Sequence, residues 1–142
     1  MTRGLITHMA RAKQVIIWPN MRWGSVTPTD IDSYLEFDGR VFVFIEVKLR
    51  GVELQTGQEL AFVRLGDVCA DANRHSLLVV SEHRTQTHEI VVLGDTSVRR
   101  YCIDASGWVH PPSLMTTLHL VAWFVKEYAG RDLTPPEIGR LT

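Results

Sequence analysis

The chain has 142 residues, of which 45% are hydrophobic and 22% charged, with a formal net charge of −1. This is ordinary globular composition and excludes a collagen-like, low-complexity or disulfide-stapled chain. No apolar run approaches the roughly 20 residues of a membrane span, and the N-terminus lacks the apolar core of a signal peptide. We therefore expect one cytoplasmic domain over residues 1–142, with no membrane partner and no small-molecule cofactor.

The N-terminal region differs from the rest of the chain in its charge. Residues 1–29 contain no Asp or Glu, and their basic side chains are Arg3, Arg11, Lys13 and Arg22. Such asymmetry fits either a basic arm that meets phosphates or a solvated terminal segment. Within this region the pattern predicts a short helix over 4–13 and a short strand over 14–19.

A hairpin is the next predicted element. The segments "IDSYLEF" and "RVFVFIEVK" are rich in β-branched and aromatic residues and flank the turn-forming pair Asp38-Gly39. A three-residue loop with Gly39 in the left-handed conformation pairs even-numbered residues with even-numbered ones, whereas a two-residue turn puts Asp32 on the opposite face. We favour the three-residue loop, because the alternative leaves Glu46 and Lys48 without an acidic neighbour.

Beyond the hairpin, the sequence predicts two helices and three more strands. The first helix covers about 57–73 and opens on a capping-box signature formed by Thr56 and Glu59. Of Arg99 and Arg100, one side chain is expected to be exposed and the other to face inward or an interface, because neighbours on a strand alternate. The other predicted elements are a buried strand (76–80), a second hairpin (89–93 with 97–103), an apolar helix from Pro111 to about Tyr128, and a helical turn in "TPPEIG". This order predicts an α/β or α+β fold with a mixed central sheet flanked by helices.

The candidate catalytic residues lie in and next to the first hairpin. Glu46 and Lys48 share one face of their strand, and the favoured register brings Asp32 close to Glu46. Two adjacent carboxylates repel each other, and a hard divalent cation such as Mg²⁺ relieves that repulsion. The backbone carbonyl of Val47 lies between the charged side chains as a further ligand, and Lys48 can hold an attacking water. The set is competent for metal-dependent hydrolysis of a phosphodiester.

The same residues also have plain structural explanations. Asp30 and Asp32 can cap a turn after Pro28, and Glu46 with Lys48 can form an exposed cross-strand pair on a half-solvated hairpin. The aromatic residues that share the face of Glu46 argue against full exposure of that pair.

The stretch "DIDSYLEFDGRVFVFIEVK" resembles the signature of the PD-(D/E)XK nuclease superfamily, with an Asp before one strand and Glu-x-Lys on the next. It is similar to small phage and prophage nuclease-like proteins and to the Holliday-junction-resolvase-like branch, in which a helical glutamine often matches Gln58. "PTD" stands in place of the strict Pro-Asp pair. The resemblance implies a restriction-endonuclease-like core, Mg²⁺ or Mn²⁺ as cofactor, and catalytic Asp32, Glu46, Lys48 and Gln58. The implied metal ligands are Asp32, Glu46 and Val47, with Asp30 as the alternative acid.

Three functions follow as hypotheses. The first is a metal-dependent DNA nuclease that acts on duplex or branched DNA, in the dimeric form common in this superfamily, with the last helix as the interface. The second is a catalytically silent nuclease fold that binds a protein partner, such as a component of a host defence system. The third is a subunit of a larger nuclease, because the chain has little room for its own DNA-recognition domain.

Overall fold

The computed structural model describes residues 19–26 and 28–134. The chain divides into two units, residues 1–30 and residues 31–142. In the first unit, Trp23 and Val26 close a tight turn through two backbone hydrogen bonds of 2.9 and 3.0 Å. The helix predicted over 4–13, most of the strand predicted over 14–19 and the turn predicted in "TPPEIG" lie outside the described residues, apart from Pro19 and Thr134.

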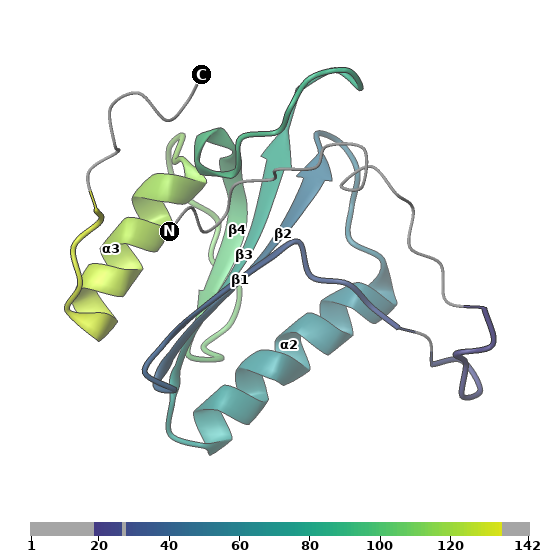
Figure 1. The fold of residues 1–142 in the computed structure, drawn as a ribbon, viewed down its shortest axis with the longest axis horizontal. Helices are drawn as coiled ribbons and strands as arrows, with labels where there is room; N and C mark the ends of the chain where they lie inside the picture. The colour runs from purple at the N-terminus through teal and green to yellow at the C-terminus, as the bar shows by residue number, and fades with distance from the viewer. Residues whose placement is uncertain (1–18, 27, 135–142) are drawn as a thin grey trace. The chain divides into compact units, whose positions relative to one another are not determined.

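Four strands of the second unit form one mixed sheet in the order β1-β2-β3-β4 (Figure 1). β1 pairs antiparallel with β2, β2 pairs parallel with β3, and β3 pairs antiparallel with β4. The parallel pair needs a crossover connection, which helix α2 supplies. The strand bounds are Ser33–Phe37 for β1, Val41–Leu49 for β2, His75–His83 for β3 and Ser97–Ile103 for β4.

The β1–β2 hairpin has the predicted three-residue loop. Phe37 pairs with Val41, which leaves Asp38, Gly39 and Arg40 in the loop. Asp38 and Gly39 have φ angles of 54° and 65°, in the left-handed region that a Gly occupies at no steric cost and that Asp tolerates. Even-numbered residues therefore pair with even-numbered residues throughout this hairpin, and the prediction of this register is confirmed.

Helix α2 (Thr56–Asp71) begins one residue before the predicted start. Its N-cap is Gln55, whose backbone N–H donates to Oε1 of Gln58 at 3.4 Å. The predicted capping box of Thr56 and Glu59 is therefore wrong. Glu59 does not reach back along the helix, because its carboxylate accepts a hydrogen bond from Arg100 of β4 at 2.9 Å.

The predicted second hairpin does not form. The segment predicted as a strand over 89–93 is irregular and ends in a short 3₁₀ turn, η1 (Leu93–Asp95), while 97–103 is strand β4 as predicted. β4 pairs with β3 on one side, and its other side is bridged by Val109 and Thr116. The segment 109–116 thus occupies the edge that the predicted partner strand would need.

Because of the same contacts, the last helix begins later in the sequence than predicted. Helix α3 (Thr117–Ala129) starts four residues after Ser113, and its N-cap Thr116 accepts a hydrogen bond from the backbone N–H of His119 at 3.2 Å. The expected start at Pro111 is wrong because the preceding segment runs along β4, where the N–H of Val98 donates to the carbonyl of Met115 at 2.8 Å.

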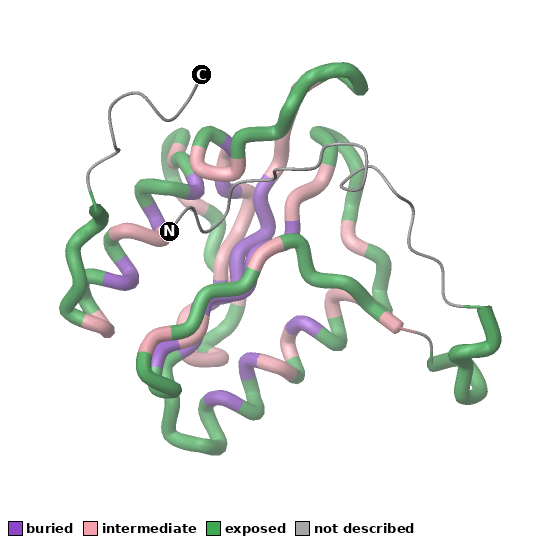
Figure 2. Tube along the Cα trace, viewed as in Figure 1, coloured by how far each residue is buried: buried purple, intermediate pink, exposed green. Residues whose placement is uncertain are grey.

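The two helices cover opposite faces of the sheet, and each face has its own core (Figures 1 and 2). Odd-numbered residues of β2 and β3 pack with α3, and even-numbered residues pack with α2, because side chains alternate along a strand. The α3-side core contains Val43, Ile45, Leu77, Val79, Leu120 and Phe124, and the α2-side core contains Phe44, Phe62, Cys69, Leu78, Val80 and Cys102. Full burial of Phe124 alone contributes about 2 kcal/mol.

The expected fold class is confirmed at the level of an α+β arrangement with a mixed four-stranded sheet and flanking helices. Among the described residues, no helix combines the length and the apolar character needed to cross a membrane.

Candidate functional site

Asp32 directly precedes the hairpin ladder. Ser33 pairs with Ile45 at the start of β1, so Asp32 lies near the part of β2 that follows Ile45. Oδ2 of Asp32 accepts a hydrogen bond from the backbone N–H of Val47 at 2.7 Å. The Asp32 carboxylate therefore lies at the peptide that joins Glu46 to Val47, and it fixes the end of the hairpin where strand pairing stops.

Glu46 and Lys48 form an ion pair on the α2 side of β2. Glu46 is 7% exposed, and its Oε1 lies 3.5 Å from Nζ of Lys48, whose side chain is 20% exposed. A pair with this little solvent is screened less than a surface pair, and removal of one partner leaves a poorly hydrated charge. The prediction that the two side chains share a face is confirmed. The alternative interpretation of them as an exposed pair is wrong, because Glu46 is buried.

Asp32 also borders a cavity at the edge of the sheet. The cavity has a volume of about 360 Å³, and Asp32, Ser33, Val47, His83, Val91 and Leu93 line it. Val47 and Leu93 pack against the α3-side core, so this cavity opens on the side of the sheet opposite to Lys48. Asp32 thus lines this cavity while its carboxylate is bonded to the backbone of β2.

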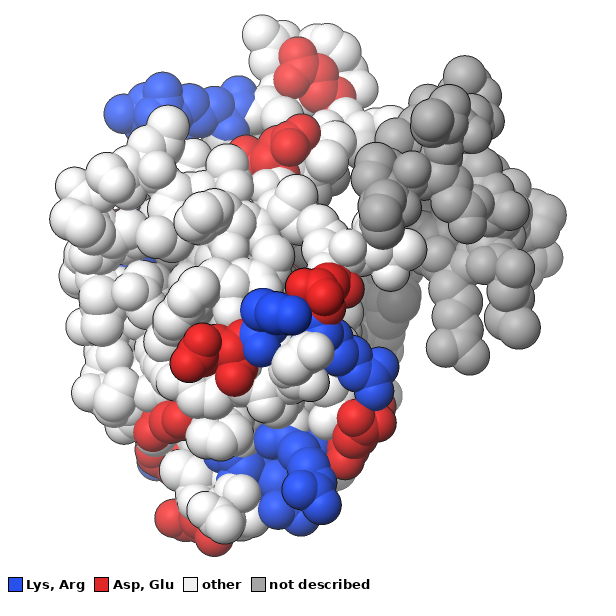
Figure 3. All heavy atoms as spheres, turned by 90° about the vertical axis from the view of Figure 1, so that its left-hand side faces the viewer, with Lys and Arg blue, Asp and Glu red and all other residues white. Residues whose placement is uncertain are grey.

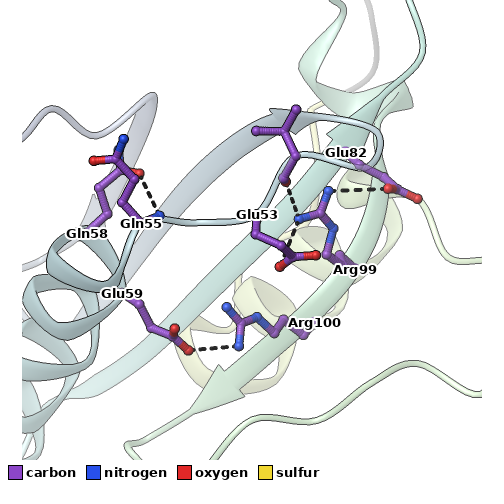
Figure 4. Close-up of polar contacts among 8 residues, drawn as sticks. Glu53, Gln55, Gln58, Glu59, Glu82, Arg99 and Arg100 are labelled. Atoms are coloured by element: carbon purple, nitrogen blue, oxygen red, sulfur yellow. Dashed lines mark hydrogen bonds and ion pairs between the residues drawn. The ribbon is translucent and has the colours of Figure 1, made fainter.

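Gln58 and Asp30 are placed differently from the other candidates. Gln58 lies in the first turn of α2, and the hydrogen bond that the structure gives it is to the backbone of Gln55 (Figure 4). Asp30 is exposed and is the last residue of the first unit, whereas Asp32, Glu46, Lys48 and Gln58 all belong to the second. The structure thus gives Gln58 a role in holding the helix start.

Two arginines of β4 build a polar network on the same side of the sheet as Lys48. Nη1 of Arg99 donates to the carbonyl of Val52 at 2.7 Å, and its guanidinium lies 3.7 Å from Glu53 and 3.4 Å from Glu82 (Figure 4). Glu82 is the β3 neighbour of Lys48 in the parallel register. Arg99 therefore ties the connection between β2 and α2 to β3 and β4.

Arg100 makes a separate set of contacts on the same side of the sheet. It pairs with Glu59 of α2 at 2.9 Å, and its guanidinium lies 4.5 Å from the centre of the Trp108 ring, in a cation–π contact. Both arginine side chains are 16% exposed, so the expectation that one of them is exposed is wrong. The register shifts between Val80 and Ser81, and this bulge breaks the alternation on which the expectation rested. The bulge has no local sequence signal such as a Gly.

Acidic and basic side chains are mixed on the face of the molecule seen in Figure 3, and no extended basic patch of described residues covers it. Part of this mixing comes from ion pairs, such as Arg131 with Asp38 at 2.8 Å and Lys126 with Asp132 at 3.0 Å. Arg99 and Arg100 are likewise satisfied by protein carboxylates. Their charge is thus largely neutralised within the fold.

The described cysteines do not contribute a nucleophile. Cys69 and Cys102 are both buried and unpaired by disulfides. Burial raises the pKa of the Cys69 thiol, and the nearby charge of Asp104 raises it further. The thiolate is the reactive form, so Cys69 stays an inert part of the α2-side core at neutral pH.

The donor atoms at the end of β2 suit a hard cation. Among the residues that the structure describes, no group of three or more His, Cys, Asp or Glu side chains is assembled as a metal site. Asp32 and Glu46 offer carboxylates, and the peptide that joins Val47 to Lys48 offers the Val47 carbonyl. Mg²⁺ commonly takes one or two carboxylates together with water and phosphate oxygens. This all-oxygen set therefore fits Mg²⁺ or Mn²⁺ if a substrate phosphate completes it.

Comparison with protein-family models, with curated proteins and with solved structures found no match to this chain.

Proposed function

We propose that the chain is a Mg²⁺- or Mn²⁺-dependent nuclease that hydrolyses phosphodiester bonds of DNA. The observation that supports the proposal is the pair of contacts at the end of the hairpin, where the Asp32 carboxylate accepts the N–H of Val47 at 2.7 Å and Lys48 lies 3.5 Å from the Glu46 carboxylate. An acid pair with an adjacent lysine is the charge pattern that phosphoryl chemistry requires, because it can hold a cation and still offer a positive group to the substrate.

The fold is consistent with a restriction-endonuclease-like core, which forms part of the proposal. An acid precedes the first strand of a hairpin, Glu-x-Lys ends the second strand, and a helix then crosses to a parallel strand. Helices on both faces leave the ends of the central strands as the place where a site can form.

Each residue has a defined role in the proposed reaction. Asp32, Glu46 and the Val47 carbonyl would hold the cation, which would orient the phosphate and lower the pKa of an attacking water. The Lys48 ammonium donates hydrogen bonds to the attacking water and to the phosphate oxygens, where negative charge builds up. A bond forms between the water oxygen and phosphorus, the bond to the leaving sugar oxygen breaks, and a proton from water ends on that leaving oxygen. The Glu46 ion pair keeps Lys48 in position.

Gln58 supports the site from the start of α2. Its side chain accepts the N–H of Gln55 and so sets where the helix begins after the β2 connection. Arg99 holds the same connection through the carbonyl of Val52. We infer that these contacts position the helix start beside the strand that carries Glu46 and Lys48.

A cleavage assay tests the proposal. The protein is incubated with supercoiled plasmid, linear duplex, single-stranded DNA and a four-way junction, each with Mg²⁺, Mn²⁺ or EDTA. We expect cleavage of at least one substrate that needs the metal and falls by at least about 100-fold in Glu46→Gln and in Lys48→Ala. Lys126→Ala is the matched control, because it also removes an ion-paired lysine, 3.0 Å from Asp132, on the far helix α3.

Two outcomes would reject the proposal. One is cleavage that persists in both site variants at the rate of Lys126→Ala. The other is the absence of metal-dependent cleavage on all four substrates by a folded protein, which would leave binding to a protein partner or a role in a larger enzyme as the explanation of the fold.

A further inference from the structure

An aromatic stack lies next to the candidate site on the hairpin. Tyr34 of β1 stands directly opposite Phe44 of β2, with ring centres 5.4 Å apart and ring planes at 23°. Phe42 continues the stack, with its ring centre 6.4 Å from that of Phe44 and 6.5 Å from that of Tyr34. All three residues are even-numbered and share the face of the sheet on which Glu46 lies.

The stack runs from the protein interior to its surface. Phe44 is buried in the α2-side core and Phe42 is partly buried, but Tyr34 is 52% exposed. β1 is the edge strand of the sheet, and α2 packs chiefly against β3, so the outer end of the stack is left open to solvent. Phe44 and Phe42 hold the Tyr34 ring in one orientation while more than half of the residue stays accessible.

The exposed ring lies beside the residues proposed to bind phosphate. On the same face of β2, Glu46 follows Phe44 by two residues, or about 7 Å, and Phe44 pairs with Tyr34. Lys48 lies one further step along β2. A flat apolar ring and a cationic group therefore follow one another along the hairpin, as a base and its phosphate do along a nucleic-acid strand.

The acidic residue on the other side of Tyr34 is turned away from the ring. Glu36 shares the face of Tyr34, but its Oε2 accepts the backbone N–H of Gly39 in the hairpin loop at 3.0 Å. Its charge is thus engaged by the loop, so the approach to the ring from that side is less repulsive to a phosphate than the sequence suggests.

We propose that Tyr34 stacks on an unpaired base of the nucleic-acid strand whose phosphate occupies the candidate site. This inference rests on the proposed function and narrows its substrate to single-stranded or locally unpaired DNA. In an intact duplex both faces of each internal base are covered by its neighbours, whereas an unpaired base offers a free π-face to an aromatic ring. Pre-stacking on Phe44 lowers the entropy that Tyr34 loses on binding.

The test measures binding without cleavage. The full chain carrying Lys48→Ala, which keeps the proposed metal ligands but is expected to cleave at least about 100-fold more slowly, is titrated in Mn²⁺ with a short single-stranded oligonucleotide that contains 2-aminopurine, whose fluorescence falls when the base stacks. We expect quenching, and an affinity that drops by about 5- to 100-fold when Tyr34→Leu is added. Tyr34→Phe should retain the quenching, because it keeps the ring. Trp123→Leu, which removes another exposed aromatic residue on α3, should leave both signals unchanged.

The variants keep this test decisive. Leu preserves apolar contact with Phe44, and a thermal melt verifies that each variant is folded. Equal affinity and quenching in the parent and in Tyr34→Leu would overturn the inference, as would the absence of oligonucleotide binding by the parent. If quenching depends on Tyr34 but the wild-type protein cleaves nothing, the stacking site stands and the nuclease proposal fails. If the wild-type protein cleaves DNA while Tyr34→Leu binds normally, only the stacking site fails.

Discussion

Among the candidate site residues, Glu46 carries the largest desolvation penalty. It follows four strand residues that are buried or nearly so, and it is itself only 7% exposed. The effective penalty for removing a carboxylate from water is several kcal/mol, and ion pairing offsets part of it. Lys48, at 3.5 Å, supplies one such interaction. A purely structural position so close to the apolar core would be served better by an apolar side chain.

This balance leads to a prediction about stability. Lys48→Met removes one ion-pair partner of a buried carboxylate, so we expect it to lower the free energy of unfolding by about 1–3 kcal/mol, measured by urea denaturation at pH 7. Lys126→Met removes a lysine from a pair that is more than half exposed, and its effect should stay within about 0.5 kcal/mol.

A double-mutant cycle that combines Lys48→Met with Glu46→Gln measures the interaction energy between the two side chains. We expect the combined variant to lose less stability than the sum of the two single variants, because the 3.5 Å ion pair that each single variant removes is counted only once. Strict additivity, or equal losses in Lys48→Met and Lys126→Met, would contradict the account of Glu46 as a paired buried charge.

The hairpin is the element that creates the candidate site. Its three-residue loop sets the register, and the register decides whether Asp32 stands on the side of Glu46 or on the opposite side. The loop depends on backbone conformations that most residues adopt with strain, at Asp38 and Gly39. The chemistry at one end of the strands is therefore controlled by the turn at the other end.

Two glycines test the role of the loop. Gly39 has a φ angle of +65°, and a Cβ there would meet no atom within 4 Å, so Gly39→Ala should cost about 1 kcal/mol of stability through backbone strain alone. Gly57 in the first turn of α2 has equal space but no left-handed φ, so Gly57→Ala should gain about 0.5 kcal/mol. Thermal and urea unfolding of the two variants should thus shift in opposite directions, and a stability gain in Gly39→Ala would contradict the loop assignment.

The elements predicted well from sequence are those specified by neighbouring residues. The Asp38-Gly39 turn, the alternation that puts Glu46 and Lys48 on one face, and the bulk of α2 all follow from local patterns. The errors arise from distant segments. The apolar run 89–93 reads as a strand, but 109–116 takes the edge of β4 that it would need. The paired burial of Arg99 and Arg100 depends on a bulge with no sequence signal.

The candidate site was predictable to a similar degree. The positions of Asp32, Glu46 and Lys48 follow from the register and strand alternation, and their catalytic roles remain predictions. Tyr34 carries no functional signal in the sequence, because its interest lies in its exposure next to Glu46 at the sheet edge.

The charges of the whole molecule limit how it can meet DNA. The net charge is −1, and the basic residues Arg3, Arg11 and Lys13 lie outside the described residues. On the described part of the chain, several arginines are already paired with carboxylates, so long-range attraction of a phosphate backbone by these groups is weak. We therefore expect local contacts at the site to contribute more to binding than general electrostatics.

The last helix keeps part of its apolar surface exposed. Leu120, Phe124 and Val125 pack on the sheet, while Leu118 and Trp123 are 44% and 47% exposed. The expected homodimer with α3 as its interface stays a prediction.

The central claim is that Asp32 and Glu46 share one cation, and Mn²⁺ binding tests it most directly. Titration of the metal-free protein with Mn²⁺, followed by calorimetry or by electron paramagnetic resonance of the free ion, should reveal one site that is lost in Asp32→Asn and equally in Glu46→Gln. Asp30→Asn is the matched control and should bind Mn²⁺ like the wild-type protein. Mn²⁺ binding that survives both Asp32→Asn and Glu46→Gln, or that depends on Asp30 and not on Asp32, would contradict the account.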